Sequence, residues 1–137
     1  IGARLCHDAG AALIVDYGRT ESTAGESLQA VRGHRRHDML RDAGSADLTA
    51  HVDFAALARA ARDAGAACYG PLDQGEFLRR IGIETRMERL CTAALPETAV
   101  AIRSGGNRLI DAREMGTLFK AMTLTAPGAP PPAGFET

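Results

Sequence analysis

The sequence predicts an α/β protein, the later part of an open α/β sheet, and three observations favour this fold class. A continuous apolar run, AALIVDYG over residues 11–18, has the length of a strand and lacks the alternation of a half-exposed one. A helical pattern follows at residues 53–64, and a last strand candidate covers residues 116–126. Helical and strand patterns therefore alternate along the chain, as they do in α/β folds.

The first elements follow from local composition. Residues 4–10 are typical of the end of a helix that Gly10 closes in the left-handed conformation. The run at 11–18 predicts a strand buried on both faces, as in a parallel sheet. The next segments are predicted as a polar loop over 19–27, a short extended segment over 28–40 and a turn over 41–45.

The helix at 53–64 is the most strongly predicted element. Phe54, Leu57, Ala58 and Ala61 follow the spacing of one helix face, and Gly65 ends it. The next predicted elements are a short strand at 66–72, broken at Gly70-Pro71, and a helix from Asp73 to about Ile81 with a capping D-x-x-E start at Asp73 and Glu76. Two helices follow at 84–94 and 97–103, separated by Pro96. The last elements before the final strand are a turn at 104–107 and a helical turn at 112–115 capped by Asp111. We expect residues 1–126 to form one incomplete domain and the Pro/Gly-rich residues 127–137 to be an extended or disordered tail.

Composition excludes several classes of function. Sixteen Lys and Arg against seventeen Asp and Glu give a net charge of −1, so no global field attracts nucleic acid or anionic lipid. The sequence predicts neither a membrane span nor a signal peptide. Its three cysteines contain no CxxC pair, which indicates a reducing, cytoplasmic-type compartment, and its four dispersed histidines predict no metal site. The first residue is not Met, and we expect the chain to be part of something longer.

A polar triplet ends the first predicted strand. In open α/β sheets ligands bind beyond the carboxyl ends of the strands, where Asp16, Tyr17 and Gly18 would lie. The carboxylate and phenol can bind a ligand, and Gly18 lets the backbone turn away without strain. The alternative is that Asp16 and Gly18 only form the turn while Tyr17 packs beneath a loop.

Two further stretches carry titratable groups. In VRGHRRH, residues 31–37, the arginines and histidines can clamp an anion. Gly33 predicts a tight turn that directs the side chains of Arg32 and His34. The alternative is a solvated basic loop, which has the same composition. In DLTAHVD, residues 47–53, an extended chain would direct alternate residues to one face. Those residues are Asp47, Thr49, His51 and Asp53. A carboxylate there can orient the His51 ring, and Asp53 is also expected to cap the following helix, which is compatible with that role.

The same residues resemble a known family. ALIVDYG, LQAVRGHRRHDML, ADLTAHVDFAAL, QGEFLRRIGIETRMERL, EMGTLFKAMTL and PPPAGF, in this order, resemble the MidA-type proteins across nearly the whole chain. These are class I, S-adenosylmethionine-dependent methyltransferases, whose mitochondrial members methylate an arginine on a subunit of respiratory complex I. The resemblance implies the C-terminal part of a Rossmann-like sheet with additional helices. The family's glycine-rich cofactor loop does not occur in this sequence, so we expect the chain alone to be inactive.

The resemblance also implies roles for the polar residues. We expect S-adenosylmethionine as cofactor and the arginine of a protein as acceptor, with a complex I subunit as the protein that the resemblance implies. The expected residues are Asp16, Tyr17, His51 and Asp53 for catalysis, Asp16, Tyr17 and Gly18 for cofactor binding, and Arg32, His34, Arg35, Asp47 and Thr49 for substrate binding. In our hypothesis Asp16 and Tyr17 face the methyl group, and His51 and Asp53 line the acceptor side with Thr49 and Asp47. His34 and Arg35 organise the loop over the site.

Two other functions stay open at this point: a non-catalytic assembly factor that holds a respiratory-complex subunit, and a small-molecule methyltransferase of the same fold. An interrupted sheet would expose a strand edge, which leaves pairing into a homo-oligomer open. We expect a bacterial-type cytoplasmic location, or the mitochondrial matrix for eukaryotic relatives.

Overall fold

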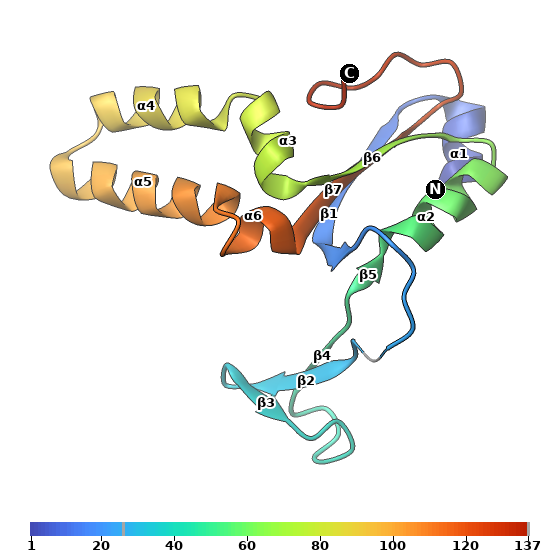
Figure 1. Ribbon diagram of the computed structural model, residues 1–137, viewed down its shortest axis with the longest axis horizontal. Coiled ribbons are helices and arrows are strands. Elements are labelled where there is room, and N and C mark those ends of the chain that lie inside the picture. The colour runs from blue at the N-terminus through green and yellow to red at the C-terminus, as the bar shows by residue number, and fades with distance from the viewer. Residues whose placement is uncertain (26, 137) are drawn as a thin grey trace.

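A computed structural model describes residues 1–25 and 27–136, and it has three parts (Figure 1). A twisted four-stranded sheet with strand order β5-β1-β7-β6 forms the centre. A three-stranded sheet of order β3-β2-β4 extends away from one end of it, and the antiparallel pair of helices α4 and α5 projects from another side. This mixture of helices and strands confirms the predicted α/β class.

The elements have the following bounds: α1 (Gly2–Asp8), β1 (Ala11–Arg19), β2 (Gln29–Arg32), β3 (Arg35–His37), β4 (Asp47–Thr49), β5 (Val52–Asp53), α2 (Phe54–Asp63), β6 (Ala67–Asp73), α3 (Gln74–Arg80), α4 (Ile83–Ala93), α5 (Pro96–Ile110), α6 (Met115–Leu118) and β7 (Phe119–Thr125). The last strand, β7, lies between β1 and β6 and is antiparallel to both. β1 and β6 are therefore parallel to each other, and their carboxyl ends lie at the same edge of the sheet.

The strand β1 forms as predicted, but its surroundings differ from the prediction. Its long neighbour β7 is antiparallel, and the parallel neighbour β5 pairs only with Gly18 and Arg19. Burial on both faces was also wrong, since Leu13 and Val15 are 55% and 43% exposed. Among the described residues, only Gly18 and Arg19 of β1 pair with β5, and the side chains of Leu13 and Val15 on one face of the strand stay exposed.

Two hydrophobic clusters hold the central sheet, one on each face. On the first face, α1 and α2 cover β1 and β7 through a cluster that includes Phe54 and Met122, both fully buried. On the second face, Phe77 of α3, Ala121 of β7 and Phe135 of the tail form a smaller cluster. The amphipathic spacing predicted for α2 therefore corresponds to its buried side, which includes Phe54, Ala58 and Ala61.

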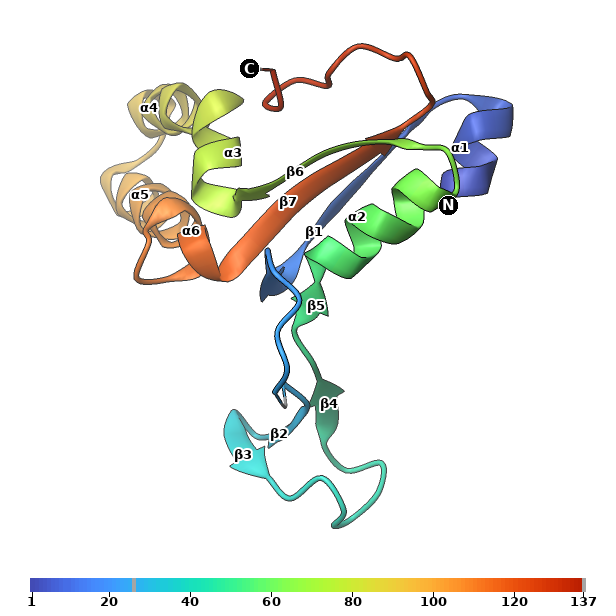
Figure 2. The same ribbon diagram turned by 45° about the vertical axis from the view of Figure 1, so that its right-hand side comes forward.

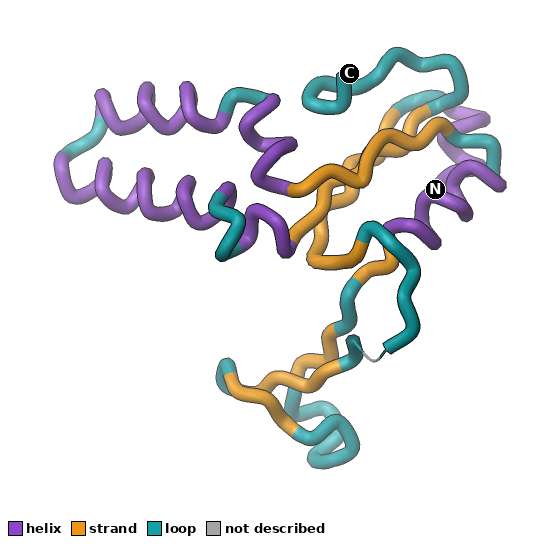
Figure 3. Tube along the Cα trace, viewed as in Figure 1, coloured by secondary structure: helices purple, strands orange, loops and turns teal. Residues whose placement is uncertain are grey.

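The tail contains no helix or strand in its described part, yet it is packed (Figure 3). Phe135 is only 6% exposed, and its ring centroid lies 5.1 Å from that of Phe77. The Tyr69 hydroxyl donates a hydrogen bond to the Ala129 carbonyl at 2.9 Å. Disorder, one of the two expected states of this tail, does not describe residues 127–136.

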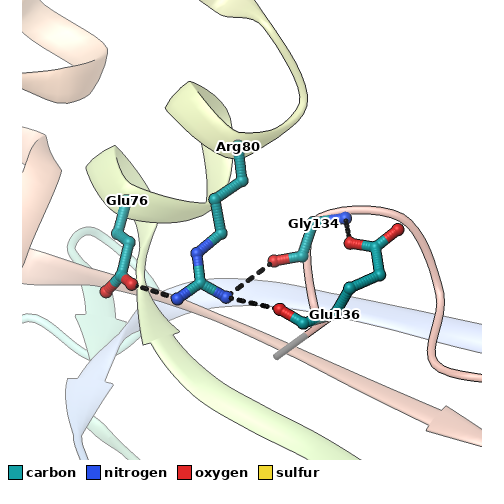
Figure 4. Close-up of polar contacts among 4 residues, drawn as sticks. All are labelled: Glu76, Arg80, Gly134 and Glu136. Atoms are coloured by element: carbon teal, nitrogen blue, oxygen red, sulfur yellow. Dashed lines mark hydrogen bonds and ion pairs between the residues drawn. The ribbon is translucent and has the colours of Figure 1, made fainter.

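A polar clasp holds the end of this tail (Figure 4). The guanidinium of Arg80 donates to the carbonyls of Gly134 and Glu136, at 3.4 and 3.3 Å, and pairs with Glu76 one helical turn away. The Glu136 carboxylate in turn accepts a hydrogen bond from the Gly134 N–H at 2.7 Å. Arg80 therefore links α3 to the tail that covers it.

Several local boundaries differ from the sequence prediction. α1 ends at Asp8, and Ala9 has a φ of 60° where Gly10 was expected to close the helix; Gly10 itself has a φ of 110°. Two successive left-handed residues thus reverse the chain so that Leu5 can enter the core. The residues 116–118 predicted as strand form α6 with Met115, so β7 begins only at Phe119.

The predicted turn at 104–107 does not exist. α5 runs continuously from Pro96 to Ile110 and packs along α4. A Cβ atom at Gly106 would lie 2.2 Å from the Met87 sulfur, whereas one at Gly105 would meet nothing within 4 Å. Helix packing therefore outweighs the low helix propensity of two adjacent glycines.

The strand β6 also continues where a break was expected. It passes through Gly70-Pro71 to Asp73 with an irregular register between Tyr69 and Leu72. Asp73 then occupies the N-cap position of α3 but makes no side-chain cap hydrogen bond, because the Lys120 ammonium binds its carboxylate. The capping role predicted for Asp73 was wrong.

Candidate functional site

The polar residues predicted at the end of β1 surround the point where β5 joins it and α2 begins (Figure 2). A row of three rings crosses this point. The ring centroid of Tyr17 lies 5.7 Å from that of His51 and 5.6 Å from that of Phe119, with edge-to-face angles of 68° and 82°. The backbone explains the second contact, because Tyr17 and Phe119 are register partners on β1 and β7.

His51 is fixed by its backbone as well as its ring. Its N–H donates to the Ser27 hydroxyl at 3.2 Å, across the loop that follows β1. Among residues 1–25 and 27–136, no hydrogen bond reaches either nitrogen of the His51 ring. The half-buried imidazole is therefore held in place while its nitrogens stay open to a ligand.

Asp53 has its carboxylate occupied at both oxygens. Oδ1 accepts the Ala56 N–H at 2.7 Å, which confirms the predicted helix cap, and Oδ2 accepts the Ser22 hydroxyl at 2.7 Å. The Arg59 guanidinium donates to the same Ser22 oxygen at 3.0 Å. The hydrogen bonds from Ser22 and then Ala56, with the Arg59 charge, hold the pKa of Asp53 below its usual value. Both oxygens are thus used by the protein itself rather than by the His51 ring.

Asp16 and Gly18 make close backbone contacts. The Asp16 carboxylate accepts the N–H of Tyr17 at 2.8 Å, a local turn-like bond. A Cβ atom at Gly18 would lie 2.3 Å from the Val52 carbonyl oxygen and 2.8 Å from the Phe54 ring. No positive φ is present at Gly18, so its role here is close approach of β5 and α2, and the predicted turn away from the strand was wrong.

The remaining predicted residues lie in the small sheet, away from the ring row (Figures 1 and 2). They are Arg32, His34 and Arg35 around the β2–β3 turn, and Asp47 and Thr49 on β4. Positions 50–51 belong to no strand, so Asp47 and Thr49 lie on β4 of the small sheet whereas Asp53 lies on β5 of the central sheet.

The tight turn at Gly33 is confirmed. Gly33 and His34 have φ values of 57° and 61°, the two left-handed residues of a two-residue hairpin turn. The segment predicted as extended over 28–40 is thus the β2–β3 hairpin. Its Arg32 side chain lies 3.6 Å from the Asp42 carboxylate, an ion pair within the small sheet.

Sequence reasoning missed several residues of this site. They are Arg19, Ser22, Ser27, Arg59 and Phe119. The two serines carry no periodic signal, and their partners His51, Asp53 and Arg59 lie 24 to 37 positions away. Phe119 had a readable signal, since it is the aromatic residue of the last predicted strand, 116–126.

Two hollows adjoin His51. One of about 70 Å³ also touches Asp53, Glu21 and Thr23, and the other, of about 170 Å³, extends toward Arg36 of β3. A larger groove of about 530 Å³ lies between α4 and α5 and contains Met87. It is remote from the ring row, so size alone does not identify the chemical site.

The family comparison covers this site. A family model described as "Putative S-adenosyl-L-methionine-dependent methyltransferase" matches residues 1–72, which include β1, the small sheet, β5 and α2. The chain belongs to this methyltransferase family.

Curated relatives of the chain agree with this family. It is 42% identical over 125 residues to the Drosophila melanogaster protein named "Protein arginine methyltransferase NDUFAF7 homolog, mitochondrial". It is 38% identical over 120 residues to the Danio rerio protein named "Protein arginine methyltransferase NDUFAF7, mitochondrial". These matches cover 90% and 88% of this chain but only 28% of each relative, so the chain spans less than a third of their length.

Two solved structures from Burkholderia thailandensis have the same fold over this region. One, an uncharacterised protein, is 28% identical with a TM-score of 0.77 and covers 99% of this chain and 37% of its own. The other was crystallised with S-adenosyl-homocysteine; it is 29% identical with a TM-score of 0.72 and covers 93% and 33%. Within the described part of the methyltransferase chain, no helix combines the length and apolar character needed to cross a bilayer.

Proposed function

We propose that this chain forms the acceptor side of an S-adenosylmethionine-dependent methyltransferase that modifies an arginine of a protein. The observation that carries the proposal is the relationship to proteins named as arginine methyltransferases, at 36–42% identity across about nine-tenths of the chain. The S-adenosyl-homocysteine in a structural neighbour supports the cofactor. Because the chain spans less than a third of those relatives, the activity belongs to a larger protein.

The residues of this chain fit the cofactor in part. Tyr17 offers a half-buried ring at the carboxyl end of β1, and Asp16 keeps one carboxylate oxygen beyond its bond to the Tyr17 N–H. The family's glycine-rich cofactor loop does not occur in this sequence. We therefore assign Asp16, Tyr17 and Gly18 to one wall of the cofactor site and most of the binding energy to residues outside this chain.

The acceptor chemistry is assigned to the ring row. When bound, S-adenosylmethionine supplies a methyl group on a sulfonium sulfur, which the acceptor nitrogen displaces. A guanidinium must lose one proton on methylation, and we assign that proton to an open nitrogen of the His51 ring. The Tyr17 ring packs edge-to-face on the imidazole and the Ser27 hydroxyl holds the His51 backbone, which favours in-line transfer. Asp53 acts here by positioning Ser22 and the start of α2, since its own oxygens are occupied.

The experiment is methyl transfer by the full-length protein from radiolabelled S-adenosylmethionine, with methylarginine identified by mass spectrometry. We expect His51→Ala to lower kcat by about a hundredfold with unchanged cofactor affinity. His7→Ala, a change at an exposed histidine of α1, is the matched control and keeps full activity. Unchanged kcat in His51→Ala removes His51 from the mechanism, and absence of saturable cofactor binding in the wild type means a non-catalytic assembly factor instead.

Acceptor and location follow from the same proposal. The sequence resemblance makes a subunit of respiratory complex I the first acceptor to test, in a bacterial-type cytoplasm or, for eukaryotic relatives, the mitochondrial matrix. A small-molecule methyltransferase would instead methylate free metabolites and leave proteins unlabelled.

A further inference from the structure

The larger of the two hollows beside His51 has an unusual charge balance. It has a volume of about 170 Å³ and lies between the central sheet and the small sheet. The residues around it are Arg19, Ser27, Leu28, Gln29, Arg36 and His51. No carboxylate lines it among the described residues, although Asp53 and Glu21 line the neighbouring hollow.

Its two arginines are available for a ligand. Arg19 donates one hydrogen bond, to the Thr23 hydroxyl at 2.7 Å, and its remaining N–H groups are not engaged by a described carboxylate. Arg36 forms no ion pair within residues 1–25 and 27–136. Arg32, on the other strand of the same hairpin, differs from Arg36 because it forms an ion pair with Asp42.

The strand register explains why Arg36 and not Arg35 faces the hollow. Arg36 pairs with Val31, and residues two apart on a strand share a face, so Arg36 and Gln29 lie on one side of the small sheet. Arg35 pairs with Arg32 on the opposite side. The sequence hypothesis chose Arg35, and the structure brings its neighbour to the site.

We propose that this hollow binds a small oxyanion, and that the oxyanion is the carboxylate of an acidic side chain near the methylated arginine of the acceptor protein. Guanidinium groups recognise carboxylates through paired N–H donors, and Ser27, Gln29 and His51 add polar groups around the same volume. The assignment of the carboxylate to an acceptor protein rests on the proposed function. Under this proposal the methyltransferase prefers acceptor arginines that have an acidic side chain beside them.

The first experiment measures anion binding by the full-length protein, with inorganic phosphate as the probe in calorimetry at constant ionic strength. We expect saturable binding that Arg36→Gln weakens by about tenfold, while the adjacent Arg35→Gln leaves it within about twofold. Equal weakening by the two variants, or no saturable binding by the wild type, overturns the hollow as an anion site.

The second experiment separates the sources of the oxyanion. Two short arginine peptides, identical except for one glutamate or glutamine beside the arginine, compete with phosphate. We expect the glutamate peptide to displace phosphate at about tenfold lower concentration, and Arg36→Gln to abolish this difference. Equal competition by both peptides overturns the acceptor assignment and leaves a site for free anions. If Arg36→Gln instead weakens cofactor binding, the carboxylate is that of the cofactor and the assignment is wrong.

The two proposals fail separately. A full-length protein that transfers no methyl group to any protein contradicts the proposed function, whereas phosphate binding and its loss in Arg36→Gln still test the hollow.

Discussion

Lys120 on β7 donates a hydrogen bond to the carboxylate of Asp73, across to the edge strand β6. The lysine side chain is 12% exposed and that of Asp73 is 42% exposed, and Lys120 also donates to the carbonyl of Thr117. In the strand register Asp16, Lys120 and Asp73 form one row across β1, β7 and β6. Because this row lies at the carboxyl ends of β1 and β6, the charge of Lys120 fixes the sheet beside the candidate site.

Replacing Lys120 by Met keeps most of the buried stem and removes the charge. We expect the free energy of unfolding to fall by about 1–2 kcal/mol, the range of a hydrogen bond to a charged group in a partly buried setting. Urea denaturation of the full-length protein measures it. Arg89→Met, on an exposed arginine of α4, is the control and should change stability by less than about 0.5 kcal/mol. Equal losses in the two variants would show that the cross-strand pair contributes nothing.

The second prediction concerns acid stability. The folded protein lowers the pKa of Asp53, chiefly through the hydrogen bond from Ser22, so the ionised carboxylate stabilises the fold. This contribution is fully present above the unfolded-state pKa, about 3.9, and is lost as the pH falls through the lower folded-state pKa. Asp53→Asn can still accept the Ala56 N–H through its amide oxygen, and its amide nitrogen can donate to the Ser22 oxygen, but it does not titrate. We therefore expect its Tm to depend less steeply on pH below about 4 than that of the wild type.

Asp8→Asn is the control for that comparison, since Asp8 is an exposed carboxylate whose partners lie within α1. A wild-type pH profile that Asp53→Asn reproduces without change would contradict the stabilising role of the ionised carboxylate.

The elements that the sequence predicted well are those whose signals are local. The cap at Asp53 and the amphipathic face of α2 depend on residues within one or two helical turns. The small sheet was missed because its three short strands have weak alternation and only one buried residue, Ala30. The continuity of α5 was missed because two adjacent glycines have low helix propensity, and its packing along α4 is not visible in the local sequence.

The candidate site was predictable in part for the same reason. Asp16 and Tyr17 follow from the rule that ligands bind at strand ends, and His51 follows from its place among the polar residues of DLTAHVD. Their partners Ser22, Ser27 and Phe119 depend on a loop path and a strand register that no local pattern encodes. Arg35 and Arg36 are the clearest example, because adjacent strand residues face opposite sides and only the register shows which side each of them faces.

The third prediction concerns the tail. Phe135→Ala removes the ring that packs on Phe77, and we expect residues 127–136 to leave the second face of the sheet. Hydrogen–deuterium exchange at the N–H of Phe135 and Gly134 should then rise at least tenfold, while exchange in α2 stays unchanged. Arg80→Gln, which loses the clasp but keeps the ring, should give a smaller rise in the same amides. Leu95→Ala, at a side chain that is 67% exposed, serves as the control. Unchanged exchange in Phe135→Ala would mean that the tail is held without its aromatic anchor.

The fourth prediction compares two neighbouring glycines of α5. Gly105→Ala adds a methyl group where nothing lies within 4 Å, so it should stabilise the protein by about 0.5–1 kcal/mol through helix propensity alone. Gly106→Ala has the same propensity gain, but its methyl group meets the Met87 side chain. We expect it to be less stable than Gly105→Ala by about 1 kcal/mol, the lower end of the cost of overpacking, because the flexible Met87 side chain has to shift toward the open groove that it borders.

A double-mutant cycle identifies the cause of that difference. In a Met87→Ala background the methyl group at Gly106 has room, so Gly106→Ala and Gly105→Ala should stabilise the protein by similar amounts. Urea unfolding of the six variants and backgrounds provides the cycle. If Gly106→Ala remains costly without the Met87 side chain, contact between α4 and α5 does not set the need for glycine, and the backbone of α5 itself must be the source of the cost.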